Sequence, residues 1–170
     1  MTLRKTAICL CLILAAFDAF GSARAFAQAT AEIFEYGEYR TRRDGEKPAD
    51  RTASGTTTMI SAYELVKRTE VINAQPGVSF GIQFRLSTSL AGADTLVFRI
   101  KHPPLTNPKT GRTMTASEFD SEPGLGAGEH YVGFTFDDGW EMAEGPWSIQ
   151  VIHNGRIIAE RPFKVVILIN

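Results

Sequence analysis

The acidic side chains of residues 137–144 are the first candidates for chemistry in this sequence. They are Asp137, Asp138, Glu141 and Glu144. Carboxylate oxygens suit calcium, but the stretch lacks the regular alternation and the glycine placement of an EF-hand loop. Acid–base catalysis by such carboxylates would require a cleft around them. The simpler interpretation is that Asp137 and Asp138 cap a turn in which Gly139 adopts a positive φ.

Trp140 lies inside this acidic stretch and gives it a second possible role. A tryptophan in such a place is either an exposed anchor for a partner or a sugar ring, or a plug that closes one end of the fold. Trp147, in contrast, begins an alternating strand pattern, and we expect it in the core. The candidate partner surface therefore consists of Asp137, Asp138, Trp140 and Glu141.

The other groups that perform catalysis or bind metals are scattered along the chain. The histidines His102, His130 and His153 are at least 23 positions apart, so they form no local pair of metal ligands. We expect His153, next to a turn, to face solvent. The sequence has no nucleophile elbow, because its G-x-S-x-G match at residues 77–81 begins an alternating strand pattern and is not a strand-to-helix turn. We therefore expect no catalytic residue, no cofactor and no metal, and we predict a protein that is not an enzyme.

The N-terminus has the layout of a secretory signal peptide. Two basic residues at positions 4–5 precede an apolar run at residues 7–16, and small-x-small cleavage sites end at Ala27 and Ala29. The apolar run is shorter than the roughly 20 residues that a membrane-spanning helix needs. We predict cleavage near Ala29, with Ala27 as the alternative, and hence a periplasmic or secreted protein.

Removal of residues 1–29 would change the chemistry of the remaining chain. It takes away Cys9 and Cys11, so residues 30–170 have no disulfide, no thiol nucleophile and no cysteine metal ligand. It leaves 15 basic and 18 acidic residues, which moves the formal net charge from −1 to −3. A mildly acidic chain lacks the basic surface of nucleic-acid-binding proteins. We expect a single domain at residues 30–170 whose partner is another envelope or secreted protein.

The strongest structural signal is a β-hairpin over residues 145–166. The Asn-Gly pair that begins at Asn154 favours a two-residue type I′ turn. Strict alternation from that turn would point Phe163 away from the core. We therefore predict a β-bulge between Ala159 and Pro162, because proline within a sheet is confined to edges, strand starts and bulges.

Alternating apolar side chains predict further strands in the rest of the chain. The cleanest pattern lies at residues 78–86, where every second residue from Phe80 onward is large and apolar. Weaker patterns predict strands at residues 31–39, 56–72, 95–101, 113–119 and 130–136. The two prolines after His102 are expected to end the strand at residues 95–101. Many short strands separated by turn signals indicate an antiparallel β-sandwich.

Two segments leave alternatives open. Residues 40–55 are polar and predict a flexible loop, although their basic side chains would also suit the docking of an acidic partner. Residues 163–169 are apolar on both faces, so this last strand is either sandwiched within the domain or meets another chain.

Three phrases of the sequence carry a family resemblance. They are HPPLTNPKTG at residues 102–111, YVGFTFDDGWEMAEGPW at residues 131–147 and RPFKVV at residues 161–166. Together they resemble a bacterial secreted family that is defined only as a domain of unknown function. The resemblance implies an immunoglobulin-like sandwich and no activity. We therefore expect an all-β, antiparallel, immunoglobulin-like β-sandwich of about seven to nine strands.

Three classes of function remain open at this point. The first is a non-catalytic binding or interaction module that uses its loops or an open sheet edge. The second is a small-ligand or carbohydrate-binding module that uses the loops around Trp140. The third, a metal-dependent hydrolase, lacks the sequence motifs that would support it.

Overall fold

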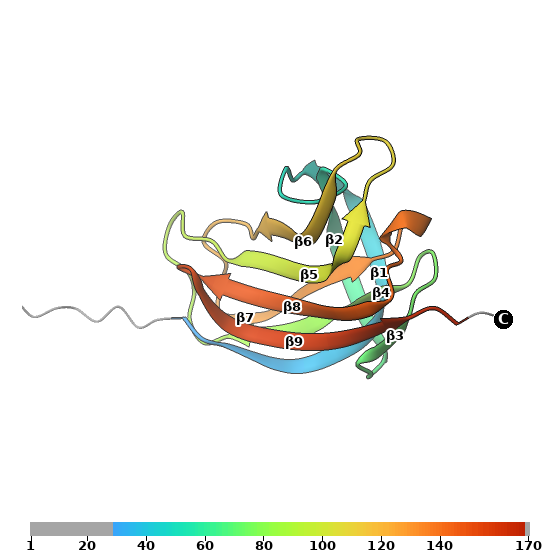
Figure 1. Cartoon of the computed structure of the whole chain (residues 1–170). Helices are drawn as coiled ribbons and strands as arrows, with labels where there is room; N and C mark the ends of the chain where they lie inside the picture. The colour runs from blue at the N-terminus through green and yellow to red at the C-terminus, as the bar shows by residue number, and fades with distance from the viewer. Residues whose placement is uncertain (1–28, 169–170) are drawn as a thin grey trace, which may run out of the picture.

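A computed structural model of the chain describes residues 29–168, which form nine strands in two packed sheets (Figure 1). The strands are β1 (Ala31–Pro48), β2 (Thr56–Lys67), β3 (Val71–Asn73), β4 (Ser79–Leu86), β5 (Val97–Thr106), β6 (Thr113–Asp120), β7 (Gly128–Thr135), β8 (Gly145–His153) and β9 (Arg156–Val166). The strand order is β2-β1-β4-β7 in one sheet and β3-β9-β8-β5-β6 in the other. Apart from the short parallel pair of β3 and β9, the strands pair antiparallel, which confirms the predicted two-layer sandwich.

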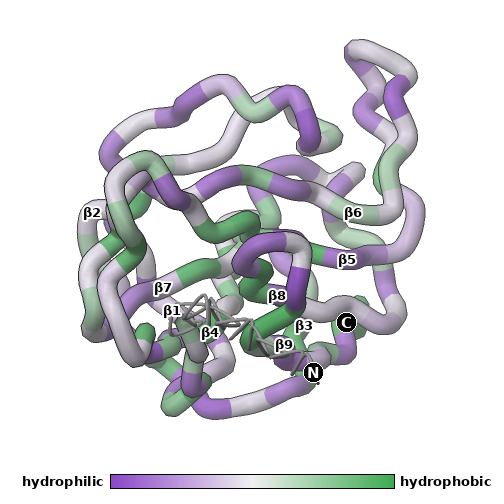
Figure 2. The backbone as a smooth tube through the Cα atoms, turned by 90° about the vertical axis from the view of Figure 1, so that its left-hand side faces the viewer, coloured by the Kyte–Doolittle hydropathy of each residue, from purple (hydrophilic) through white to green (hydrophobic). Residues whose placement is uncertain are grey.

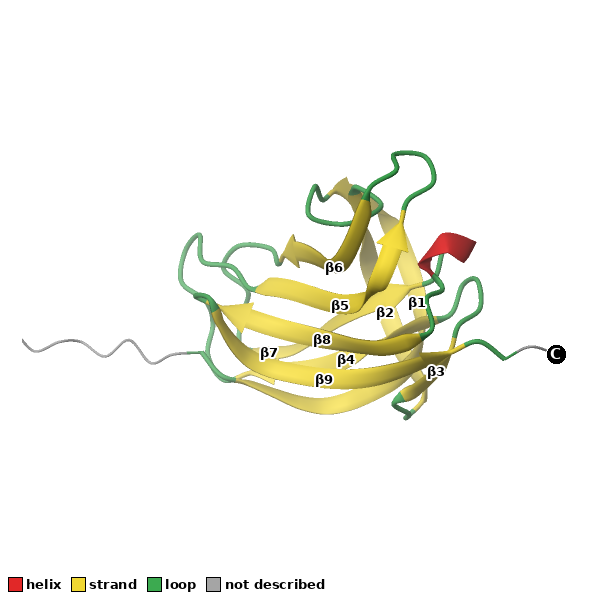
Figure 3. Ribbon diagram, in the orientation of Figure 1, coloured by secondary structure: helices red, strands yellow, loops and turns green. Residues whose placement is uncertain are grey.

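The predicted signal peptide lies almost entirely outside the described residues. Ala29 is described, and its side chain is buried against the hydrophobic core. Cleavage after Ala27 would keep this contact, whereas cleavage after Ala29 would remove it. Within residues 29–168, no helix has the length and apolar character needed to cross a membrane, and the helix that is present, η1 (Gly139–Glu141), is a single short turn (Figure 3).

The core lies between the sheets and consists of the residues that the alternating patterns predict. Phe80 is fully buried at its centre, and Trp147 is 2% exposed. The Trp147 ring lies 5.7 Å from the Phe80 ring and 5.1 Å from the Phe134 ring, which is the spacing of favourable aromatic pairs. The hydrophobic stretches accordingly gather toward the middle of the molecule (Figure 2). The prediction that Trp147 belongs to the core is confirmed.

The C-terminal hairpin has the predicted turn, but its bulge lies at a different position. Asn154 and the following glycine both have positive φ, at 50° and 73°. The register slips at Ile158, directly after the turn, and the ladder then runs regularly through Pro162. The predicted position of the bulge was therefore wrong, whereas its expected effect is present, because Phe163 points into the core. Pro162 is tolerated because β3 pairs only with residues 164–166, which leaves the outer edge of β9 open beside it.

Strand β5 continues past the two prolines that were expected to end it. Its pairing with β8 stops at Lys101, and its pairing with β6 is interrupted there and resumes at Leu105. The prolines lie in this interruption, so they break the hydrogen-bonded ladder without ending the strand. At the C-terminal end, Val165 is fully buried, while Ile167 and Leu168 are exposed beyond the end of β9.

The largest departure from the sequence prediction is in β1. It continues as a strand through residues 40–48, where we expected a flexible loop. Its first half pairs with β4 and its second half pairs with β2. Beyond the end of β4 the two strands form a two-stranded ribbon, residues 40–67, which we call the arm. In Figure 1 the arm rises behind β5 towards β6, at a steep angle to β8 and β9.

A glycine just before the arm cannot be replaced by another residue without strain. Gly37 has a φ of 141°, and a Cβ atom built on it would lie 2.0 Å from the backbone oxygen of Lys67. The return strand of the arm therefore passes directly against the backbone of β1 at this point. Gly37 permits both the unusual backbone angle and the close approach.

Candidate functional site

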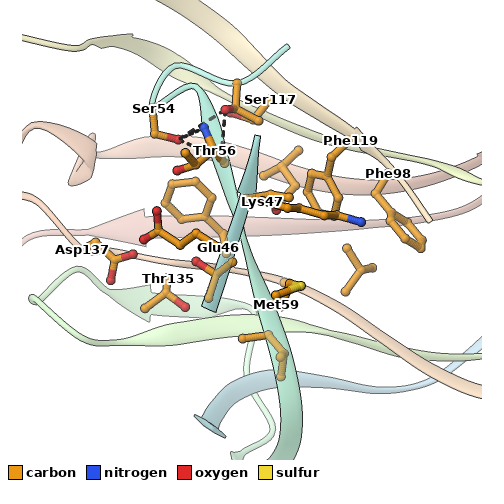
Figure 4. Close-up of a pocket in the computed structure, with 18 of the residues that line it drawn as sticks. Glu46, Lys47, Ser54, Thr56, Met59, Phe98, Ser117, Phe119, Thr135 and Asp137 are labelled. Carbon is orange, nitrogen blue, oxygen red and sulfur yellow. Dashed lines mark hydrogen bonds between the residues drawn. The ribbon is translucent and has the colours of Figure 1, made fainter. Parts of the chain in front are cut away.

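The arm covers a cavity of about 970 Å³ on the open side of the sandwich (Figure 4). Its floor is apolar and is built by side chains of β5, β6 and β7. They are Phe98, Ile100, Leu105, Phe119, Val132 and Phe134. Residues 56–60 of β2 form its cover. Concave, largely apolar spaces of this size are typical of ligand-binding sites.

All four residues of the predicted partner surface line one end of this cavity. Trp140 is half-buried, packs against the edge of the hydrophobic core, and donates a hydrogen bond from Nε1 to Oδ2 of Asp138 at 3.1 Å. It thus both closes the end of the sandwich and borders the cavity. Asp137 forms an ion pair with Arg43 of the arm. The structure therefore brings these residues together beside a cavity, rather than leaving them on an open loop.

Glu141 differs from the other three because its carboxylate turns inward. The residue is 7% exposed, and its Oε2 accepts hydrogen bonds from the backbone N–H groups of Asp137 and Asp138 at 2.8 and 3.0 Å. Burial raises the pKa of Glu141, and the two hydrogen bonds partly oppose that rise. The predicted positive φ at Gly139 was wrong, since this glycine begins the short helix η1. Glu141 therefore fixes the turn and is not a free surface group.

The histidines remain separate in the structure. His153 was expected to face solvent, and that prediction was wrong: it is buried, with Nε2 2.7 Å from Oδ2 of Asp94 in the connection before β5. His102 is also buried, with Nε2 3.1 Å from Oγ of Ser117, and burial lowers its pKa. Among residues 29–168, no three His, Cys, Asp or Glu side chains are grouped in a way that could hold a metal ion.

Polar contacts at its tip hold the arm over the cavity. Lys47 and Glu122 form an ion pair at 2.8 Å, and Arg51 and Asp120 form another at 2.6 Å. The backbone N–H of Glu118 in β6 also donates a hydrogen bond to the backbone oxygen of Arg51 at 2.8 Å. Four of the five basic side chains of residues 40–55 are thus paired with acids of the same chain, and the fifth, Arg42, donates a hydrogen bond to Oγ of Ser61.

An aromatic cluster that the sequence patterns did not reveal supports the base of the arm. The Tyr63 ring stacks on the Tyr131 ring of β7 at 4.7 Å, and Tyr39 meets Tyr131 edge-on at 4.9 Å. Burial raises the pKa of the Tyr131 hydroxyl. A Cβ at Gly133 would lie 2.2 Å from that hydroxyl, so the glycine leaves the space that the ring occupies. The three tyrosines come from three different strands, and no local motif links them.

Acidic residues predominate among the charged residues that line the cavity. The lining contains two lysines, Lys47 and Lys109, and seven acidic residues: Glu46, Asp120, Glu122, Glu129, Asp137, Asp138 and Glu141. In Figure 4, Phe98 and Phe119 lie at one side of the view, and Glu46 and Asp137 lie at the other. An apolar floor with an acidic border favours a ligand that has both apolar and cationic groups.

Comparison with known proteins places this architecture in a family. The chain matches a protein-family model described as "Domain of unknown function (DUF3859)" over residues 27–165. The chain belongs to this family. The comparison with curated proteins found no match. A similar solved structure is an immunoglobulin-like protein from Pseudomonas aeruginosa, with 22% sequence identity and a TM-score of 0.62, covering 84% of this chain and 99% of that one. The likeness confirms the immunoglobulin-like fold of this DUF3859 domain.

Proposed function

We propose that this DUF3859 domain is an exported, non-catalytic binding module whose ligand site is the cavity beneath the arm. The observation that carries the proposal is the convergence of Trp140 and its acidic neighbours on a cavity with an apolar floor. Such a site offers burial for apolar groups and attraction for cationic groups, without a catalytic constellation. A periplasmic or secreted location is part of the proposal and is supported by the signal-peptide pattern.

Binding of a carbohydrate at Trp140 is the second candidate. It is supported by the position of the Trp140 ring at one end of the cavity. However, the floor consists of phenylalanine and aliphatic side chains, which bury apolar groups more favourably than sugar hydroxyls. We therefore favour a macromolecular partner that places apolar side chains on this floor.

Peptide selection from a random library tests the proposal. Peptides selected on the exported wild-type protein should bind a Thr58→Trp variant at least tenfold more weakly, because Thr58 lines the cavity and an indole there would fill it. Ala62→Trp is the matched control, since residue 62 is exposed on the same strand and does not line the cavity. Equal affinity of the selected peptides for all three proteins would overturn the proposal.

A glycan panel tests the second candidate in the same samples. A fluorescence change of the wild type that is absent in Trp140→Ala would favour carbohydrate binding. No response of the wild type to any glycan would remove this candidate.

A further inference from the structure

We infer that the ligand is an extended segment of another protein, which adds as a strand to the free edge of β7 beneath the arm. The inference rests on the proposed function, since it names the occupant of the same cavity. The juxtaposition that carries it is a regular sheet edge, uncharged over residues 131–135, beside an apolar floor whose border contains carboxylates.

The cavity follows the backbone of β7 and does not merely touch one of its faces. Seven consecutive residues, 129–135, line it. Neighbouring side chains of a strand point to opposite faces of the sheet, so a space on one face would contact only every second residue. Contact with all seven means that the cavity runs along the edge of the strand, where a further strand would pair.

The hydrogen-bond pattern shows which backbone groups of β7 face this space. The N–H of Phe136 donates to the carbonyl of Val78 at 3.1 Å, in continuation of the ladder between β7 and β4. Alternate pairs of an antiparallel ladder exchange hydrogen bonds, so the even-numbered residues of β7 bond to β4. The N–H and C=O groups of the odd-numbered residues point to the free edge; these residues are Glu129, Tyr131, Gly133 and Thr135.

The other sheet edges among the described strands are less suited to accept a partner. The edge strand β3 has three residues, the open stretch of β9 before it contains Glu160, Arg161 and Pro162, and β2 has three register irregularities against β1. In β6, the N–H of Glu118 already donates to the arm. In contrast, β7 pairs with β4 over eight residues without a shift, and residues 131–135 contain neither a charge nor a proline. Natural edge strands are protected by charges, prolines, irregularity or a cover, and here the arm is the cover, which leaves a regular backbone edge of β7 inside the cavity for a partner strand.

The chemistry of the cavity specifies the sequence of the partner strand. Alternate side chains of an added strand would face the floor around Phe98 and Phe119, where apolar residues fit. Glu129 at the start of β7 and Asp137 and Asp138 after its end place carboxylates at both ends of the edge; Glu129 also pairs with Arg85, and Asp137 with Arg43. The segment should therefore have about eight residues, alternating apolar side chains, and lysine or arginine towards both ends.

Backbone methylation of a synthetic peptide tests strand addition directly. The probe is a nine-residue peptide, acetylated and amidated, in which valines alternate with threonines and lysines, with lysine at both ends. Its affinity is measured by fluorescence anisotropy on the full exported protein. In an added strand, alternate N–H groups of the peptide donate to β7. N-methylation of the N–H groups that face β7 should weaken binding at least tenfold. N-methylation of the N–H groups between them, which point away from β7, should weaken binding less than threefold. Replacement of lysine by glutamate should also weaken binding at least tenfold.

A variant on the protein side makes the same test independently. Glu129→Pro removes an N–H that points to the free edge, and Glu129→Ala is its matched control because it removes the carboxylate but keeps the N–H. The proline variant should bind the probe threefold to tenfold more weakly than the alanine variant, with unchanged circular dichroism.

The outcomes separate this inference from the proposed function. If Thr58→Trp blocks the peptide but both methylated sets bind equally, strand addition is excluded while the cavity remains the site. If neither the probe nor any library peptide binds the wild type, a strand partner is excluded. If the probe binds with the same affinity to Thr58→Trp, both proposals fail.

Discussion

The body of the sandwich and the arm are both made of paired strands, yet they are stabilised by different means. In the body, inward side chains such as Phe80 and Ile149 are fully buried between two sheets. In the arm, most side chains of residues 40–48 and 57–67 face solvent, and Met59 remains 42% exposed. A two-stranded ribbon is marginally stable on its own. The arm therefore depends on its contacts with the body at its base and tip.

The largest effect is expected in the body. Trp147→Ala would leave a void among four aromatic rings and should lower the free energy of unfolding by about 3–5 kcal/mol. Urea denaturation followed by circular dichroism measures the loss. A decrease in the free energy of unfolding of less than about 1 kcal/mol would show that the aromatic cluster is not a main source of the stability of the body.

A glycine substitution at the base should affect the arm alone. Gly37→Ala introduces a Cβ into the backbone of the return strand and strains a positive φ, at a cost of about 1–3 kcal/mol. Amides of β2 should then exchange with solvent about tenfold to hundredfold faster, while those of β8 keep their rates. Gly126→Ala is the control, because a Cβ there meets no atom within 4 Å. Equal exchange rates of the β2 amides in Gly37→Ala and Gly126→Ala would refute the role of Gly37.

Acid should destabilise the body through His102. Burial lowers the pKa of this histidine, so the folded protein holds it neutral while the unfolded chain takes up a proton below about pH 6.5. Its contribution to stability is complete above that pH and is lost as the pH falls towards the lowered value. His102→Gln should have a flatter dependence of the free energy of unfolding on pH between 7 and 5. Identical pH profiles for the two proteins would exclude His102 as the cause.

The smallest effect is expected from a single ion pair between the arm and the body. Arg43→Met removes the pair with Asp137 but keeps the apolar stem, and both charged groups are more than a third exposed. The free energy of unfolding should fall by less than about 1 kcal/mol. The difference in free energy of unfolding between the wild type and Arg43→Met should be smaller still at high salt, because salt screens exposed charges. Arg40→Met, which removes an ion pair within the arm, controls for the loss of an arginine.

Sequence patterns predicted the body well because its strands are buried on one face. Alternation at residues 78–86 and around Trp147 reports directly on which side chains face the core. The arm has no such alternation, because both of its faces contact water, so residues 40–48 resembled a loop. The burial of His153 was not predicted for a related reason. Its position beside a turn gave no sign that its side chain would contact Asp94, which is distant in the sequence.

The candidate site was predictable only in part. Asp137 and Trp140 stand out by composition, and the structure places them at one end of the cavity. The floor and the cover come from strands that are far apart in the sequence, with Phe98 and residues 56–60 lining the same cavity. No local motif can encode such an arrangement, since it depends on the close approach of β2 to β1 at Gly37 and on the docking of the arm tip.

Residue-resolved amide exchange of β7, with and without the alternating basic peptide, tests the central claim most directly. In the free protein, the amides of Tyr131, Gly133 and Thr135 should exchange faster than those of Val132 and Phe134, which bond to β4. Addition of the peptide should slow the odd-numbered amides at least tenfold and leave the even-numbered amides nearly unchanged. If the peptide binds and the odd-numbered amides keep their rates, no strand is added to this edge, and the account is contradicted.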